Sequence, residues 1–408
     1  MTVEIKVEVR KQNIENHMSI PLAYSYRSIA VRKGASAMAV LGIALVVVVF
    51  VVMLSLAEGF QRAVSTSGSP RNIIIMRKGA DAELQSQVRT EAGKVIEEMP
   101  LIATAPDGTK LFSYESLTLF SRTKRDGGHS QVNVRGLSPV GFQIHEGVTL
   151  KTGRWMAPGT LECVVGAALA RRIEGFEIGG AIVSGKHSFS IVGIFEGGGS
   201  GFESEVWMDG HLFVNIFNRA DIRQSFIFRV IGDPDVAKAR LEKEFEDDPR
   251  LRSCQVQVES VYYYNQSIMM TKVILTLGGF LTSIMSIGAM VGAMNTMYAA
   301  VSQRKREIGC LSALGFTPAS IWMAFILESL CLALAGAVLG CLASLCFDGI
   351  RTGTTNWTTF SETAFEFTIT WPILAKATGV ALFMGFIGGF LPALQASRLK
   401  VVEALRRT

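Results

Sequence analysis

The sequence lacks the clustered basic residues by which nucleic-acid-binding proteins are usually recognised. Only 18% of its 408 residues are charged, the net charge of +5 is scattered along the chain, and no long Lys/Arg block occurs. Binding to a phosphate backbone needs a concentrated basic surface. Nucleic acid is therefore not expected as a partner.

Cysteine is scarce and shows no metal or redox pattern. The six cysteines form no CxxC pair and no Cys/His spacing of the zinc kind, so no metal site is indicated. Most of them are interpreted as small apolar residues. Cys163 and Cys254 lie in the polar middle of the chain and could form a disulfide if that region is extracytoplasmic, although the sequence gives no geometric evidence for the bond.

Catalytic motifs are missing as well. Neither GxSxG nor HExxH occurs. Residues 180–187 read GAIVSGKH, which has the GxxxxGK frame of a phosphate-binding loop, but His187 stands where Ser or Thr would hold magnesium. Gly185 and Lys186 more naturally form a hairpin turn between two strands. We expect this chain to be no enzyme and to hold no cofactor.

Long apolar runs, by contrast, are abundant. The first extends from Ala35 to Ala57 without a charged residue, and three more follow at about 273–297, 321–346 and 371–394. Because about 20 residues at a rise of about 1.5 Å cross the hydrocarbon core, each run predicts a transmembrane helix. A signal peptide would have a shorter apolar part nearer the start, so we expect the first run to remain as an anchor.

The spacing of these runs predicts the fold. We expect an α-helical membrane protein with four transmembrane helices and a mixed α+β extracytoplasmic domain inserted between helices 1 and 2. The insert, residues 58–267, has ordinary mixed composition with β-type runs at Ile73–Met76 and Ser190–Phe195. Residues 268–408 then form the rest of the membrane domain.

Basic residues predict the orientation. They flank the spans in three places: Arg27, Arg32 and Lys33; Arg304, Lys305 and Arg306; and Arg398, Lys400, Arg406 and Arg407. The positive-inside rule places these segments in the cytoplasm. Both termini are then cytoplasmic, residues 58–267 lie outside, and the chain is a multi-pass protein of the plasma (inner) membrane. In the N-terminal segment, residues 1–34, an interfacial helix is expected at Ile20–Val31, with a solvated segment as the alternative.

Small residues and one carboxylate stand out within the spans. Three GxxxG pairs are present: Gly288 with Gly292, Gly336 with Gly340, and Gly385 with Gly389. Glycine is frequent in membrane helices, but three pairs together favour a tightly packed bundle over a polar conduit. Glu328 is the one acidic residue well inside a span. It is either functional or a carboxylate near the cytoplasmic interface that is reached by water or paired with a basic residue.

The segment after the second span is basic and then amphipathic. Ile308, Leu311 and Leu314 recur at helical spacing, Gly315 can end a short helix, and Thr317 before Pro318 can cap the next one. We therefore predict a short cytoplasmic helix at about residues 302–316. This segment is either a basic loop that sets the membrane topology, followed by the start of the next helix, or a helix whose apolar face binds a cytoplasmic partner.

Five stretches are specific enough to carry a family resemblance. They are RKREIGCLSALGFTPASI (304–321), LPALQASRLKVVEALRR (391–407), GRW (153–155), VVGAALARRI (164–173) and FSIVGIFEGGGSGFESEVWM (189–208). In these motifs and in the one-plus-three layout of spans, the chain resembles the MacB/FtsX/LolC-type permease superfamily of ABC systems. MacB carries a fused ATPase, so the resemblance implies a permease whose ATP hydrolysis comes from another polypeptide.

The resemblance also implies site residues. It assigns contacts with a cytoplasmic ABC ATPase subunit to the coupling segment: Arg306, Glu307, Ile308, Leu311, Leu314 and Gly315. The family's C-terminal motif corresponds to Pro392, Ala396, Arg398, Leu405 and Arg406.

Partners and purpose follow from the same resemblance. It implies a dimer with a second copy or a paralogue, contact with membrane lipids, and ATP-driven movement passed to the outer domain, which is mechanotransmission. The implied function is export of lipoprotein, lipid, peptide or drug substrates. The alternative is an FtsX-like transducer that regulates a cell-wall hydrolase without transport. The cargo, the choice between homodimer and heterodimer, and the need for a periplasmic adaptor stay open.

Overall fold

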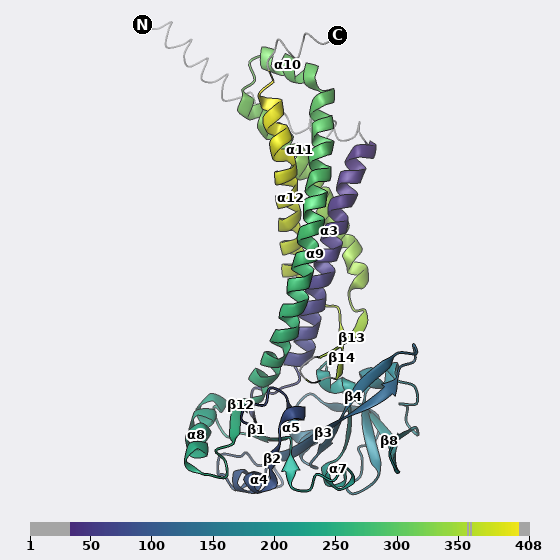
Figure 1. Ribbon diagram of the computed structural model, residues 1–408, viewed down its shortest axis with the longest axis vertical. Coiled ribbons are helices and arrows are strands. Elements are labelled where there is room, and N and C mark those ends of the chain that lie inside the picture. Colours follow the sequence, from purple (N-terminus) through teal and green to yellow (C-terminus); the bar gives the residue numbers. More distant parts are fainter. Residues whose placement is uncertain (1–32, 357–358, 360, 400–408) are drawn as a thin grey trace. The chain divides into compact units, whose positions relative to one another are not determined.

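The computed structural model describes residues 33–356, 359 and 361–399 (Figure 1). The chain divides into two compact units. The helix unit contains the described parts of Met1–Ser55, Leu275–Asp348 and Ile369–Thr408, and the sheet unit contains Leu56–Ile274 and Gly349–Thr368. The interfacial helix expected at residues 20–31 lies outside the described residues.

Four helices among the described residues are long and apolar enough to cross a membrane. They are α3 (Lys33–Ser65), α9 (Glu259–Gln303), α11 (Pro318–Ser344) and α12 (Trp371–Ser397). Three of them contain a predicted apolar run, and α11 covers the run at about 321–346 except for its last two residues, which begin the 3-10 turn η3 (Leu345–Phe347). The helices α3 and α9 are longer than their runs, because polar turns that belong to the sheet unit continue them, and hydropathy alone does not register such turns.

Small residues bring the helices of the helix unit together. A Cβ atom on Gly340 of α11 would lie 2.7 Å from the Ala44 carbonyl oxygen of α3, and one on Gly385 of α12 would lie 2.4 Å from Ala333 Cβ of α11. Only glycine permits such close backbone approach. Gly288 and Gly292 of α9 differ, because a Cβ atom there would meet nothing within 4 Å in the described chain.

The sheet unit is built on a ten-stranded sheet. The strand order is β12-β1-β11-β3-β4-β9-β6-β8-β5, and β7 pairs with β8. The strands are β1 (Asn72–Arg77), β3 (Phe112–Thr123), β4 (His129–Leu137), β5 (Thr149–Gly153), β6 (Glu162–Gly166), β7 (Ala181–Ser184), β8 (His187–Glu196), β9 (Glu205–Asp209), β11 (Ser225–Arg229) and β12 (Cys254–Val258). A second small sheet pairs β2 (Val88–Arg89) with β10 (Ile222–Arg223), and a third pairs β13 (Arg351–Thr355) with β14 (Glu362–Glu366).

Short helices surround this sheet. They are α4 (Thr90–Glu97), α5 (Gly141–Ile144), α6 (Ala167–Arg172), α7 (Gly210–Ile216) and α8 (Pro234–Asp247), with 3-10 turns η1 (Glu83–Gln85) and η2 (Gly201–Ser204). Strand β1 is buried on both faces because successive side chains point to opposite sides. Ile73 and Ile75 pack in the cluster that contains α4 and α8, whereas Ile74 and Met76 pack in the cluster that contains Phe60 of α3.

The β-type runs and the predicted turn are confirmed. Ile73–Met76 falls in β1, and Ser190–Phe195 falls in β8. Ser184 of β7 pairs with His187 of β8 across Gly185 and Lys186, and Gly185 has a φ of 59°, which is the left-handed region that hairpin turns use. The GxxxxGK frame is therefore a hairpin turn.

The sheet unit contains a segment that the sequence analysis assigned to the membrane domain. Hairpin β13–β14 lies between α11 and α12 in the chain but belongs to the compact sheet unit. Lys124 Nζ lies 2.8 Å from Glu362 Oε2, and the Ala364 backbone N–H donates to Ser204 Oγ at 2.9 Å. These partners are more than 150 residues apart, so hydropathy and local pattern do not predict them.

The two cysteines considered for a disulfide are free and lie in different places. Cys163 in β6 and Cys254 in β12 are both buried, in separate apolar clusters. Burial raises the pKa of the Cys163 thiol to about 12 and that of Cys254 to about 11. Both thiols therefore act as small apolar core residues.

Candidate functional site

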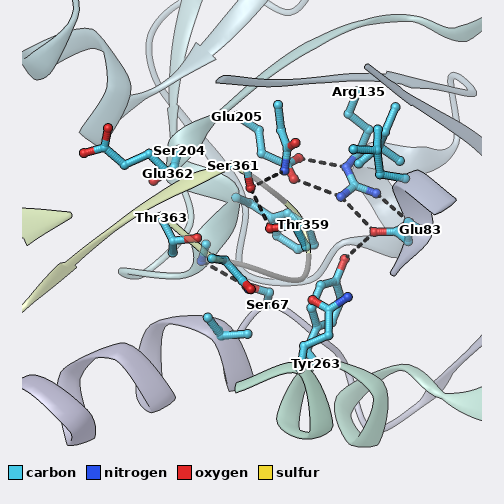
Figure 2. Close-up of a pocket in the computed structure, with 18 of the residues that line it drawn as sticks. Ser67, Glu83, Arg135, Ser204, Glu205, Tyr263, Thr359, Ser361, Glu362 and Thr363 are labelled. Atoms are coloured by element: carbon cyan, nitrogen blue, oxygen red, sulfur yellow. Dashed lines mark hydrogen bonds and ion pairs between the residues drawn. The ribbon is translucent and has the colours of Figure 1, made fainter. Parts of the chain in front are cut away.

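A buried ionic cluster centred on Arg135 lies inside the sheet unit (Figure 2). The Arg135 side chain is 1% exposed and is carried by β4. Its Nε donates to Glu205 Oε2 at 2.7 Å, and its Nη1 donates to Glu115 Oε2 at 2.6 Å and to Glu83 Oε1 at 3.0 Å. One guanidinium thereby joins β3, β4, β9 and η1. Burial alone would lower the pKa of Arg135, but Glu205 and Glu83 hold it well above the usual range.

His145 extends the cluster. Its Nε2 lies 2.7 Å from Glu115 Oε1 and its Nδ1 lies 3.6 Å from Glu259 Oε1. Burial alone would lower the pKa of His145, but Glu115 and Glu259 raise it to about 10. Burial would likewise raise the pKa of Glu115, but His145 and Arg135 lower it to about 2. At neutral pH the pair is therefore an ionised carboxylate and an imidazolium.

The first turns of α9 are bonded into the same cluster. Tyr263 Oη donates to Glu83 Oε2 at 3.2 Å, and the Glu83 backbone N–H donates to Tyr262 Oη at 2.9 Å. Glu259 accepts from Asn72 Nδ2 at 2.8 Å. The cluster thus fixes the start of α9 to the sheet.

The chemistry open to this cluster is limited by its size. The cavity beside it has a volume of about 50 Å³, which suits water and excludes a drug-sized substrate. Within the described residues no group of His, Cys, Asp and Glu is arranged to hold a metal ion. The cluster is therefore suited to holding elements together. Sequence reasoning missed it, because its members come from distant strands and turns and no local motif joins them.

The predicted cytoplasmic helix is present as α10 (Lys305–Ala313). Gly315 follows it with a φ of 95°, and Thr317 caps α11 by accepting from the Ser320 backbone N–H at 3.2 Å, with Pro318 in the first turn. Both the break and the cap agree with the sequence prediction.

The side chains of α10 do not all face outward. Leu314, directly after α10, is 71% exposed, Leu311 is half-buried, and Arg306 and Glu307 are exposed. Ile308 is 2% exposed and packs in the core cluster with Met297 and Ile321. Ile308 therefore offers no surface to a partner in this structure. The prediction that Ile308 contacts the ATPase is corrected: this side chain holds α10 in place. The helical spacing was right, but the apolar side of so short a helix is divided between the chain's own core and solvent.

Glu328 is paired with a basic residue. Arg304 Nη1 donates to Glu328 Oε2 at 3.0 Å, with the side chains 11% and 7% exposed. Arg304 also lies 3.8 Å from Glu307. Of the two interpretations of Glu328, the geometry matches the paired carboxylate that ties the start of α10 to α11.

The remaining predicted residues lie along α12. Pro392 and Ala396 are buried in its last turns, and Arg398 follows its end. Leu405 and Arg406 lie outside the described residues. The first residues of the C-terminal motif therefore pack against the rest of the chain at the end of α12.

Comparison with known proteins defines the class. Residues 36–247 match the family model of the MacB-like periplasmic core domain, and residues 279–401 match that of the FtsX-like permease C-terminal domain. An apolar-helix unit with an inserted mixed α/β unit and these two domains defines an ABC transporter permease. The chain belongs to the MacB/FtsX-type family of such permeases.

Individual relatives are distant in sequence. The macrolide export ATP-binding/permease protein MacB of Bdellovibrio bacteriovorus is 23% identical over 94% of this chain and 61% of its own length. The uncharacterized ABC transporter permease YknZ of Bacillus subtilis is 22% identical over 97% of this chain and 98% of its own length. The pyoverdine export ATP-binding/permease protein PvdT of Pseudomonas aeruginosa is 25% identical over 93% of this chain and 58% of its own length. The chain therefore spans about three fifths of the MacB and PvdT relatives and nearly all of YknZ.

Proposed function

We propose that this chain is the permease subunit of an ABC-type exporter that passes ATP-driven movement from a separate cytoplasmic ATPase to its sheet unit. The observation that carries the proposal is the continuity of α9. This helix is one element of 45 residues, its first turns are bonded into the buried Arg135 cluster, and its end leads into α10 through Arg304. A stiff helix held at both ends suits the transfer of movement along its axis.

The ATPase contact is assigned to the exposed side of α10 and the turn that follows. Leu314 is an exposed apolar side chain, and the exposed residues Arg306 and Glu307 lie near it in the chain. A central apolar anchor with a polar rim is the usual composition of a binding patch. The Arg304–Glu328 ion pair would hold this patch in one orientation.

The inserted domain supports a role in export more than a role in signalling. Residues 36–247 match the MacB-like core, and relatives include proteins named for macrolide and pyoverdine export. We propose lipoprotein, lipid, peptide or drug cargo handled outside the membrane, with both termini in the cytoplasm. The FtsX-like transducer has less support because the match covers a MacB-like domain. A second permease copy could pack at Gly288 and Gly292 of α9, where a Cβ atom would meet nothing within 4 Å in the described chain.

Co-purification tests the ATPase contact. We expect the wild-type chain, extracted in mild detergent, to bring down an ABC ATPase subunit that mass spectrometry identifies. Leu314→Asp should reduce the recovered ATPase about tenfold or more, because burying a carboxylate in an apolar contact is costly. Val183→Asp is the matched control, since Val183 is 60% exposed on β7 of the sheet unit.

Either of two results would contradict the proposal. If Leu314→Asp retains as much ATPase as Val183→Asp, the contact lies elsewhere. If folded wild-type protein recovers no ATPase from its native membrane, the coupling role itself is wrong.

A further inference from the structure

A second cavity in the sheet unit is far larger than the one beside Arg135. Its volume is about 420 Å³. Its walls are the last turns of α3, helix α6, the glycine-rich loop before η2, and hairpin β13–β14. Ala63 and Phe365, which are each 4% exposed, give it an apolar side. A volume of this size accommodates a small molecule or the head of a larger one.

The cavity carries an excess of positive charge. Four arginines and two glutamates line it, and the glutamates are already engaged. Glu366 pairs with Arg351, and Glu203 Oε1 accepts the backbone N–H groups of Gly197 and Gly199 at 3.0 and 2.9 Å. Arg171 is 3.9 Å from Glu203, which is a loose contact. Guanidinium groups without a close carboxylate are suited to binding an external oxyanion.

Arg62 is the arginine most available to a ligand. It is exposed on α3 and makes no ion pair or side-chain hydrogen bond within the described residues. Arg172, by contrast, is held by Glu362 of β14. Among the described residues, the cavity thus contains one arginine without an ion pair, Arg62, one loosely paired arginine, Arg171, and two closely paired ones, Arg172 and Arg351.

The hydroxyl of another wall residue also lacks a hydrogen-bond partner within the described residues. Ser200 lies in the glycine-rich loop, is 2% exposed, and its Oγ makes no hydrogen bond within the described residues. Leaving a buried hydroxyl unpaired costs free energy. The Oγ atom is itself buried, so a ligand in the cavity would reach it only after a small rearrangement of the loop. The exposed guanidinium of Arg62 therefore carries the case for an anionic ligand, and Ser200 is a secondary contact.

We propose that this cavity binds the phosphate of an anionic phospholipid headgroup. Arg62 would contact the phosphate oxygens, Ser200 would donate a hydrogen bond, and the apolar side beside Phe365 would accept the first carbons of the lipid. This goes beyond the proposed export function, because it assigns a ligand class and a binding site to the sheet unit whatever the exported cargo is.

Chain connectivity selects a lipid over a soluble anion. Arg62 lies about one and a half turns, or roughly 8 Å, beyond the predicted end of the first membrane span in the same helix. Thr368, another wall residue, precedes the start of α12 at Trp371 by three residues, which reach at most roughly 11 Å. Two walls of the cavity are therefore tethered close to the ends of helices that are expected to span the bilayer, which is where headgroups are found.

Native mass spectrometry of the delipidated full chain tests the proposal. We expect dioleoyl phosphatidylglycerol to bind with a saturable component of one molecule per chain, more tightly than dioleoyl phosphatidylcholine. Arg62→Gln should weaken this component about tenfold, the loss typical of one charge-assisted hydrogen bond. Ser200→Ala should weaken it by a smaller factor without lowering the melting temperature, since it removes an unpaired hydroxyl.

Matched controls separate site binding from general lipid adhesion. Arg89→Gln makes the same charge change at an exposed arginine of β2, outside the cavity, and should leave the affinity unchanged. Inorganic phosphate should compete only at much higher concentration than the lipid. Equal affinities of Arg62→Gln and Arg89→Gln, no preference for phosphatidylglycerol, or inorganic phosphate binding as tightly as the lipid would each overturn the proposal, the last by assigning the site to a free anion.

Discussion

The buried cluster around Arg135 holds more carboxylates than basic groups. Glu83, Glu115, Glu205 and Glu259 face only Arg135 and His145 within the described cluster. Desolvation makes such clusters weak sources of stability compared with apolar packing, so their value lies in fixing one geometry. As a hypothesis for this protein, the geometry that is fixed is the attachment of α9 to the sheet, because Tyr263 and Glu259 of α9 are among the groups that the cluster binds.

We expect His145 to make this attachment dependent on pH. Its pKa rises from 6.5 to about 10 on folding, so its contribution is fully present below pH 6.5 and is lost as pH rises toward 10. The pKa of Glu115 falls from 4.5 to about 2, so its contribution is present above pH 4.5 and is lost as pH falls toward 2. The pair therefore stabilises the fold most between about pH 4.5 and 6.5.

We expect the melting temperature of the full chain to fall between pH 6.5 and 10, measured by differential scanning fluorimetry in detergent. His145→Gln should melt lower than wild type at pH 6 and should lose most of this pH dependence. His129→Gln, at an exposed position in the same strand as Arg135, is the control and should follow wild type. Parallel curves for wild type and His145→Gln would contradict the assignment.

At the scale of the helices, the three GxxxG pairs have different surroundings. Gly340 touches the backbone of α3, whereas Gly288 faces open space in the described chain. The same glycine pattern therefore serves internal packing in α11 and α12 and leaves an uncovered face on α9. Sequence alone does not separate these cases, because the neighbour of each glycine depends on how the helices assemble.

Alanine substitution at these two glycines should separate the cases experimentally. Gly340→Ala places a methyl group 2.7 Å from the Ala44 carbonyl oxygen and from Val47 Cβ, so the helices must shift, and we expect a loss of about 1–3 kcal/mol. The methyl group of Gly288→Ala would meet nothing within 4 Å in the described chain, so this change should leave stability unchanged or slightly higher. Thermal unfolding of both variants in the same detergent measures this, and equal melting temperatures would show that the α3–α11 contact is not formed.

The elements that could be predicted from sequence are the ones with local signals. The four long helices follow from long apolar runs, α10 follows from Gly315 and from the Thr317 cap, and β7–β8 follows from Gly185. The Arg135 cluster could not be predicted, since Glu83, Glu115 and Glu205 each look like ordinary surface charges until the sheet brings them together. The burial of Ile308 was missed for the same reason, because its neighbours are on α9 and α11.

At the scale of the whole chain, the prediction to test is the orientation of the protein in the membrane. The charge pattern predicts that α10 is cytoplasmic and that the sheet unit is outside. Two positions can report on this. Cys310 of α10 is an exposed native thiol, and Val183 of β7 is 60% exposed and can be replaced by cysteine. The buried thiols of Cys163 and Cys254 serve as internal negative controls.

We expect a membrane-impermeant maleimide to label Val183→Cys in intact spheroplasts and to leave Cys310 unmodified. Opening the membrane should then expose Cys310, because helix α9 with its long apolar run separates the two sites in the chain. Peptide mass spectrometry identifies which thiol has reacted, so the other cysteines do not confuse the result. Labelling of Cys310 in intact spheroplasts would reverse the orientation, and α10 could then no longer serve as the contact for a cytoplasmic ATPase.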